Sequence, residues 1–269
     1  MVATYEPPIG PQRNSRVLPR GGDHRQRGNS DLPKRWGGLL FAPVALPPDV
    51  NVRNYEPRDR EAIRRLCCET GFLGKPIDPV FEDRELFADY LTSYYTDVEP
   101  EAAFVLELGG VVKGYLLGSR RPFRQQWFSF FENLRLFAIG MLRYRRYNQA
   151  TREFIQWILK NSWREVPAAP RRTAHFHFNV LPEAQRLSST QVMVNKYFDF
   201  LRSHGEKKVF GQIVTFESRR GAKVLERLGF LVVEKKEITK YRGKHPEPVY
   251  LTTVIKQLAA PDSCSLAGR

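Results

Sequence analysis

Residues 174–214 decide the fold, and they read AHFHFNVLPEAQRLSSTQVMVNKYFDFLRSHGEKKVFGQIV. The pattern over Ala174–Leu181 alternates with a period of two residues, which predicts a strand. A helix is expected over Gln191–Ser203, because Ser or Thr can cap its start and Gly205 can end it. Val209–Phe216 predicts a second strand beyond that helix.

The segment that follows continues the succession of strands and helices. Residues 218–230 read SRRGAKVLERLGF and predict a helix over Ser218–Leu228 that Gly229 stops. Two further strands are expected over Phe230–Glu237 and Tyr250–Lys256.

The chain upstream of residue 119 has the same mixed character. A Gly109-Gly110 pair between two apolar runs is a strong hairpin signal. The expected elements are a strand at Asn51–Tyr55, helices at Arg58–Thr70 and Glu82–Tyr95, and strands at Ala103–Leu108 and Val111–Gly118. The predicted fold class is therefore α/β, with a mixed, partly antiparallel sheet, helices on both faces and one helical insert.

The two ends of the chain differ from its body. Residues 1–50 hold 8 of the 19 prolines and 6 of the 19 glycines, a density that opposes long helices and strands. We expect an irregular basic tail over 1–50, one domain over 51–260 and a disordered tail over 261–269. The N-terminus lacks an apolar signal-peptide core, and three cysteines make no disulfide framework or metal-ligand spacing. These features favour a cytoplasmic protein without a metal site.

Charge gives the first indication of a partner. The chain carries 43 Lys and Arg against 29 Asp and Glu, for a formal net charge of +14. Such a balance favours an anionic partner, either a nucleic acid, a phosphorylated cofactor or an acidic membrane face.

Much of this charge lies in the insert, residues 119–172. It holds twelve Lys or Arg against three Glu, and three of the four tryptophans. Within Gln126–Tyr147, helical spacing places large apolar residues near one face and arginines near the other. The insert is either a helical cover on the sheet with a solvated basic face, a substrate lid, a surface for anionic membranes or one for nucleic acid.

The order of these elements resembles the GNAT superfamily of acyl-CoA-dependent N-acyltransferases. The likeness covers roughly residues 51–258 and includes FADYLTSYYTDVEPEAAFVLELGGVVKGYLLGS at 87–119, which has that fold's helix-then-hairpin layout. The arginine- and aromatic-rich insert before an A-H-x-H strand is similar to bacterial GNATs that resemble the acetyltransferase-like domain of O-GlcNAc hydrolases. The resemblance implies acetyl-CoA as co-substrate and an amine, of a small molecule or a peptide, as acceptor.

The segment Gln185–Thr190 is the candidate phosphate site. It leads into a helix, and the free N–H groups and dipole at a helix N-terminus suit the pyrophosphate of coenzyme A. The family loop usually reads Gln/Arg-x-x-Gly-x-Gly/Ala, whereas Ser188 and Thr190 replace both glycines here. The alternative is a helix-capping run without a ligand. The predicted cofactor-binding residues are Asn179, Val180, Leu181, Gln185, Arg186, Leu187, Ser188, Ser189, Thr190 and Ser218.

His175 and His177 are the candidate catalytic residues. A spacing of two places both on one face of the strand with Asn179. Transfer of an acyl group to an amine needs a base, and the usual histidine pKa suits neutral pH. The pair is similar to the two strand histidines of arylalkylamine N-acetyltransferases, which act as base through water. Alternatively, both rings form hydrogen bonds to the covering insert.

One departure from the family pattern affects the general acid. The family usually has a tyrosine where this chain has Leu225, so either another residue protonates the thiolate, with Tyr144, Tyr147 and Tyr197 as candidates, or the thiolate leaves unassisted, or the chain does little chemistry. The sequence favours an acetyl-CoA-dependent N-acetyltransferase that works by direct attack of the amine. The alternative is a catalytically impaired module of this fold whose insert binds a partner protein, an anionic membrane or a nucleic acid.

Overall fold

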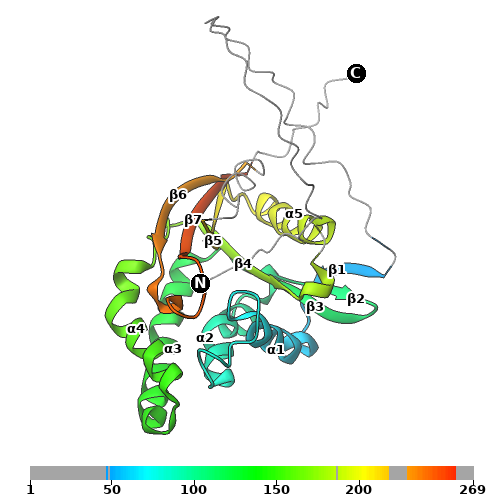
Figure 1. The fold of residues 1–269 in the computed structure, drawn as a ribbon. Helices are drawn as coiled ribbons and strands as arrows, with labels where there is room; N and C mark the ends of the chain where they lie inside the picture. Colours follow the sequence, from blue (N-terminus) through cyan, green and yellow to red (C-terminus); the bar gives the residue numbers. More distant parts are fainter. Residues whose placement is uncertain (1–46, 48, 186, 218–228, 259–269) are drawn as a thin grey trace, which may run out of the picture.

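A seven-stranded sheet organises the part of the chain that the structure, a computed structural model, describes: residues 47, 49–185, 187–217 and 229–258 (Figure 1). The strand order is β1-β2-β3-β4-β5-β7-β6, and every neighbouring pair is antiparallel except the parallel pair β4–β5. The predicted mixed, partly antiparallel sheet is confirmed. The strands are β1 (Val50–Asn54), β2 (Ala103–Leu108), β3 (Val111–Ser119), β4 (Ala174–Val180), β5 (Lys208–Phe216), β6 (Leu231–Glu237) and β7 (Val249–Gln257).

Five α-helices lie within the described residues. They are α1 (Arg60–Thr70), α2 (Arg84–Asp97), α3 (Pro122–Arg143), α4 (Gln149–Glu165) and α5 (Leu187–Ser203). Four are close to predicted positions, and α4 lies in the insert, where no separate range was predicted for it. Two helices begin four residues early, α3 at Pro122 before the expected Gln126 and α5 at Leu187 before the expected Gln191. The two predicted tails and the helix expected over Ser218–Leu228 lie outside the described residues, except for residues 47, 49 and 50 at the end of the N-terminal tail.

The hairpin predicted from Gly109-Gly110 joins β2 to β3. Both glycines have positive φ values, 58° and 77°, as a type I′ turn requires. β2 and β3 then pair from Leu108–Val111 to Ala103–Leu117.

The helices divide between the two faces of the sheet (Figure 1). α5 covers one face, where Tyr197 and Phe198 pack on Phe176 of β4. α1 and α2 cover the opposite face over β2 and β3, and α4 covers that face over β5 and β7. Helices on both faces are therefore confirmed.

Glu99 fixes the point where β3 leads into the insert. Its fully buried carboxylate accepts hydrogen bonds from the Tyr94 hydroxyl at 2.8 Å, the Ser119 hydroxyl at 2.6 Å and the Arg120 N–H at 2.9 Å. Three donors satisfy a carboxylate that would otherwise be costly to bury. Because these donors come from α2 and the end of β3, the start of α3 is held against α2.

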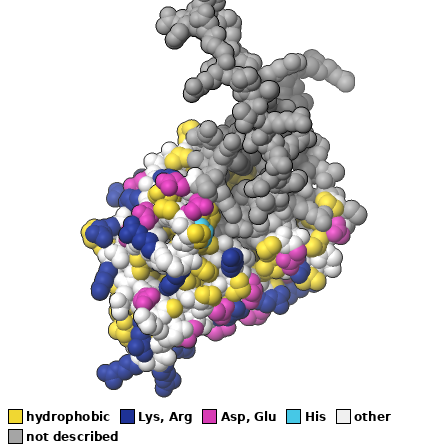
Figure 2. Space-filling model, viewed as in Figure 1, with side chains coloured by type: hydrophobic (Ala, Val, Ile, Leu, Met, Phe, Trp, Pro, Cys, Tyr) yellow, Lys and Arg dark blue, Asp and Glu magenta, His cyan; other side chains and the backbone are white. Residues whose placement is uncertain are grey.

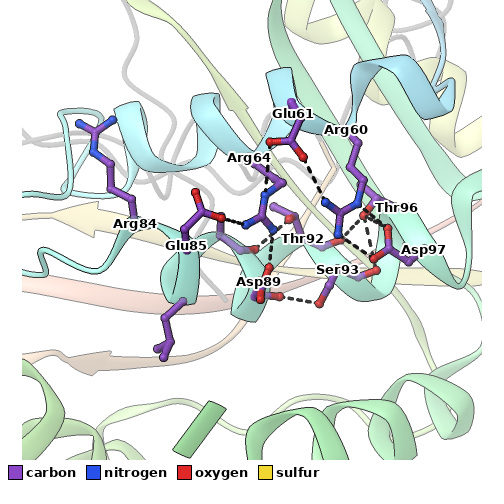
Figure 3. A network of polar contacts seen from close by, with 12 residues as sticks. Arg60, Glu61, Arg64, Arg84, Glu85, Asp89, Thr92, Ser93, Thr96 and Asp97 are labelled. Atoms are coloured by element: carbon purple, nitrogen blue, oxygen red, sulfur yellow. Dashed lines mark hydrogen bonds and ion pairs between the residues drawn. The ribbon is translucent and has the colours of Figure 1, made fainter. Parts of the chain in front are cut away.

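Charged side chains join α1 to α2 (Figure 3). Arg64 is almost fully buried and pairs with Asp89 and Glu85, and Arg60 pairs with Asp97 through two contacts of 3.0 Å. Asp89 also accepts from Arg135 of α3 at 3.0 Å. This network therefore joins three helices on one face of the sheet.

The connection between α3 and α4 ties the insert to the start of α2. Asp83 caps α2 through the Leu86 N–H and also accepts from Arg143 at 2.8 Å and from the Tyr147 hydroxyl at 2.5 Å. Asn148 caps α4 and donates to the carboxylate of Glu82. Part of the basic excess of the insert is thus neutralised by α2-side carboxylates.

The two insert helices bury different amounts of apolar surface. α4 packs on the sheet face through Phe154 and Trp157, as expected of a covering helix. The same expectation is wrong for α3, in which only Leu136 and Gly140 are buried. Its exposed large apolar side chains are Phe123, Trp127, Phe130, Phe131, Leu134, Phe137, Met141 and Leu142.

Candidate active site

The sheet opens between β4 and β5. The two strands pair over three residues, from Ala174–Val209 to Phe176–Gly211, although both continue beyond that point. β4 therefore keeps its partner β3 on one side, while on the other side its last four residues pair with no strand in the described part of the chain. This splay leaves an opening beside the end of β4.

Alternation along β4 determines which backbone groups face the opening. The Leu181 N–H donates to the Lys113 carbonyl at 2.9 Å, so Leu181 and, by alternation, Asn179 direct their N–H groups to β3. Phe178 and Val180 direct theirs away from β3. Of the predicted cofactor-binding residues Asn179, Val180 and Leu181, Val180 therefore directs its N–H into the opening, whereas Asn179 and Leu181 direct theirs to β3.

α5 starts just past the end of β4, at the same edge of the sheet as the opening. Its first turn contains Leu187, Ser188, Ser189 and Thr190, and the N–H groups of Leu187, Ser188 and Ser189 precede the first intrahelical donor. Ser189 is fully buried, and its hydroxyl has no hydrogen-bond partner among the described residues.

An anion fits this helix start. It would receive several N–H donors, the positive end of the helix dipole and the Ser189 hydroxyl. The residues are in a helical turn, not in the loop that the sequence predicted. Gln185 instead binds the end of β4, since its side-chain amide donates to the Val180 carbonyl at 3.2 Å. Arg186, Ser218 and Leu225 lie outside the described residues.

His175, His177 and Asn179 share one face of β4, as predicted. The rings of both histidines contact Tyr95 of α2 edge-on. The His175 Nε2 lies 2.9 Å from the Tyr95 hydroxyl, and the Asn179 amide donates to the Tyr115 hydroxyl at 2.7 Å. The alternative in which the insert holds the histidines is therefore wrong, because α2 supplies the partner of His175.

His177 differs from His175 in its polar contacts. Its side chain is only 2% exposed, and neither ring nitrogen has a hydrogen-bond partner among the described residues. Burial lowers the pKa of His175 to about 4 and that of His177 to about 3. Both rings are thus neutral near pH 7, and a neutral ring can accept a proton, although the low pKa makes it a weak base.

A large apolar cavity lies on the α2 side of the sheet. Its volume is about 470 Å³. α2 contributes Phe87, α3 contributes Phe137, α4 contributes Trp157, and Asn179 of β4 reaches it from the sheet opening. The cavity and the start of α5 therefore lie on opposite faces of the sheet, and both adjoin the splayed part of β4.

The sequence did not identify two residues that give this cavity its polarity, Lys240 and Tyr241. The Lys240 Nζ lies 4.7, 4.8 and 4.9 Å from the ring centroids of Phe154, Trp157 and Tyr241. Burial lowers the Lys240 pKa to about 8. The only signal in the sequence is an ordinary Thr-Lys-Tyr run, and its role depends on α4, about 80 residues upstream.

The tyrosines proposed as general acids lie elsewhere. The Tyr197 hydroxyl donates to the His175 carbonyl at 2.8 Å, and the Tyr147 hydroxyl is held by Asp83. Tyr144 accepts from Gln156 and stacks with Arg152. None of the three lines the cavity, whereas Tyr90 and Tyr241 do.

Other chemistry is limited within the described residues. Cys67 and Cys68 are buried free thiols, and burial raises their pKa values to about 12 and about 11. In the part of the chain that the structure describes, no group of His, Cys, Asp and Glu has the arrangement of a metal site. No described helix is both long and apolar enough to cross a membrane.

Comparisons with known proteins give likenesses among solved structures. No protein-family profile and no curated protein matches the chain. A structure called SsHAT is 23% identical, with a TM-score of 0.49, and the match covers 79% of this chain and 100% of that one. A putative acetyltransferase from Salmonella typhimurium, solved with acetyl-CoA, is 18% identical over 80% of this chain and 99% of its own, with a TM-score of 0.44.

A third likeness is to a polyamine N-acetyltransferase from Drosophila melanogaster. It is 13% identical, the match covers 78% of this chain and 100% of that one, and the TM-score is 0.44. Solved acetyltransferases are thus among the structures to which this chain is similar. Because these identities are low, the function of this chain has to be inferred from the residues of its own site.

Proposed function

We propose that this protein is an acyl-CoA-dependent N-acyltransferase, with acetyl-CoA as the expected donor. The observation that carries this proposal is the splay of β4 from β5, which adjoins the start of α5 and the apolar cavity. The sequence resemblance to GNAT enzymes supports it. The finer likeness, to bacterial GNATs that resemble a domain of O-GlcNAc hydrolases, stays a prediction.

The residues divide the work between the two faces of the sheet. The N–H groups of residues 187–189 and the Ser189 hydroxyl would hold the pyrophosphate, and the backbone groups of Phe178 and the Val180 N–H would pair with the pantetheine arm. Acyl-CoA supplies a thioester, whose carbonyl carbon the amine nitrogen attacks as the C–S bond breaks. A backbone N–H of β4 directed into the opening would stabilise the oxyanion.

The proton on the attacking amine needs an acceptor. His177 is the best candidate, because both its ring nitrogens are available and its ring stays neutral at any pH near 7. His175 is bonded to Tyr95 and would position the strand face. With this assignment the acidic limb of kcat/KM reports the pKa of the substrate amine, and no ionisation near pH 6.5 is expected.

Replacing Ser188 with glutamate tests the cofactor site. A carboxylate in the first turn of α5 favours the helix through its dipole, yet it repels a phosphate at the same place. Ser188→Glu should therefore keep or raise the melting temperature while the Kd for acetyl-CoA, measured by calorimetry, rises at least about tenfold. Ser203→Glu adds the same charge at the other end of α5 and should bind acetyl-CoA like the wild type. Equal affinity in both variants, or no binding by the wild type, would refute the proposed site.

A second function is favoured by the exposed face of α3: binding to an anionic membrane surface. Trp127 and Phe131 stack on this face and are 63% and 62% exposed. Several exposed basic residues of the insert form no ion pair with a described carboxylate, among them Arg124, Arg145, Arg146 and Lys160. Figure 2 shows dark blue and yellow side chains together over the α3–α4 end of the molecule. An apolar face beside unpaired cations is typical of a helix that lies on acidic lipid.

Vesicle sedimentation tests this membrane surface. The protein should sediment with vesicles containing phosphatidylglycerol, and less so with pure phosphatidylcholine. Trp127→Ser/Phe131→Ser should lose this binding without a change in melting temperature, because both side chains are exposed. Binding to RNA with no binding to either vesicle would favour the nucleic-acid alternative and contradict the membrane surface.

A further inference from the structure

The charge of Lys240 lies among aromatic rings, and Glu165 is the acid whose charge acts on it. Its ammonium lies among three aromatic rings that line the cavity, and it forms no ion pair with a carboxylate among the described residues. Cation–π contacts stabilise such a charge only in part, as the lowered pKa of the group indicates. An anion brought into the cavity would therefore gain an unusually poorly solvated partner.

The carboxylate of Glu165, whose charge acts on Lys240, accepts hydrogen bonds from other donors. Glu165 accepts from the Trp157 indole N–H at 2.7 Å, from the Thr239 N–H at 2.7 Å and from the Thr239 hydroxyl at 2.8 Å. These bonds orient Trp157 and the residue before Lys240, and the Lys240 side chain lines the cavity. The carboxylate thus builds the cage around Lys240 without neutralising it by direct contact.

The cavity also keeps open volume at a position where a side chain would fit. Gly140 is a buried residue inside α3 that lines the cavity, and a Cβ added to it would meet no atom within 4 Å. A glycine within a helix is less favourable than alanine by about 1 kcal/mol. The chain thus carries an unfavourable residue where a larger one would fill the cavity.

We propose that the cavity binds an amphipathic carboxylate, with its apolar body among α2, α3 and α4 and its carboxylate paired with Lys240. Resting on the proposed function, this ligand is the acceptor: an apolar amine that also bears a carboxylate, with its amine directed to Asn179 at the sheet opening. The apolar lining selects the body, the single unpaired ammonium selects the acid, and Asn179 lies where β4 separates from β5.

A matched pair of probes tests the carboxylate. 1-Naphthaleneacetate and 1-naphthaleneethanol share one ring system and differ in the charged group. By calorimetry at pH 7, the wild type should bind the carboxylate more tightly than the alcohol. Lys240→Met should weaken the carboxylate about 10- to 100-fold and leave the alcohol within about twofold, as expected for loss of a hydrogen-bonded charge pair.

Gly140→Leu tests the location. It fills the open volume and improves the helix, so it should melt no lower than the wild type yet bind neither probe. Trp127→Ser, on the exposed face of α3, should bind both probes like the wild type.

Equal carboxylate affinity in the wild type and Lys240→Met, unchanged binding by Gly140→Leu, or no binding of either probe by the wild type would overturn the inference. Acetyl-CoA titrations of the same proteins separate it from the proposed function. Binding of naphthaleneacetate without binding of acetyl-CoA would refute the acyltransferase while leaving the cavity ligand in place.

Discussion

At the scale of single residues, the molecule contains two neighbouring histidines with opposite polar environments. His175 has a hydrogen bond to Tyr95, and His177 has two buried ring nitrogens with no partner among the described residues. A buried polar atom without a hydrogen-bond partner destabilises the fold, so replacing it with an apolar group stabilises the protein. Removing one member of a buried hydrogen-bonded pair leaves the other member without a partner and destabilises the protein. The same substitution should therefore have opposite effects at the two positions.

His177→Phe should raise the free energy of unfolding by about 1–3 kcal/mol at pH 7, while His175→Phe should lower it by a similar amount. Denaturation by urea measures both. Because burial lowers both histidine pKa values, the unfolded chain takes up protons below pH 6.5 that the folded chain does not. Wild-type stability should thus fall between about pH 6.5 and 4, less steeply in each variant. A destabilised His177→Phe protein would contradict this description of the ring.

Lys240 should produce a pH effect at the alkaline side. Its folded pKa of about 8 lies below the ordinary 10.5, so the unfolded chain binds the proton more tightly between these values, and stability contributed by this group rises with pH there. Glu165, whose charge acts in the opposite sense, and Tyr241 are the other ionisable groups facing it.

Lys240→Met should therefore be more stable than the wild type at pH 7, and the difference should shrink as the pH approaches 10.5. Lys160→Met, at an exposed position of α4, provides the control and should show no such trend. Chemical denaturation at a series of pH values measures this difference and shows whether the Lys240 side chain is charged at pH 7 in the folded protein. A difference that stays constant with pH would contradict the buried ammonium.

At the scale of elements, the contact between α5 and β3 is tighter than any pattern in the sequence indicates. A Cβ on Gly118 would lie 2.3 Å from the ring of Tyr197, whose hydroxyl bonds to the His175 carbonyl. Gly118→Ala should therefore destabilise the protein by about 1–3 kcal/mol, because a fixed, hydrogen-bonded ring has to move. Gly118→Ala/Tyr197→Leu should recover part of that loss in thermal melts. A single variant as stable as the wild type would show that the ring moves freely.

Element boundaries could be read from the sequence where local signals exist. The two glycines at 109–110 fixed the β2–β3 register, and alternation located β4 with its histidines on one face. The start of α5 could not be placed, because Ser and Thr serve equally as caps and as first-turn residues. Ser188 and Thr190, which were predicted in a loop, therefore lie in the helix.

At the scale of the whole molecule, the sequence predicted which elements exist but not what covers them. Helical periodicity showed that α3 has an apolar face, and it contains no information on whether another element buries that face. The cavity combines Phe87, Phe137, Trp157, Asn179 and Lys240 from separate elements, so no local pattern foretells it. The candidate bases on β4 were predictable, whereas the chemistry of the acceptor side was not.

The central claim is that acyl-CoA binds between the splayed end of β4 and the start of α5. Residue-resolved amide hydrogen exchange with and without saturating acetyl-CoA tests it most directly. The amides of Phe178, Val180 and residues 187–189 should gain protection, while Leu181, whose N–H is already bonded to β3, should change little. Unchanged exchange at residues 178–190, or protection confined to other parts of the chain, would contradict the claim.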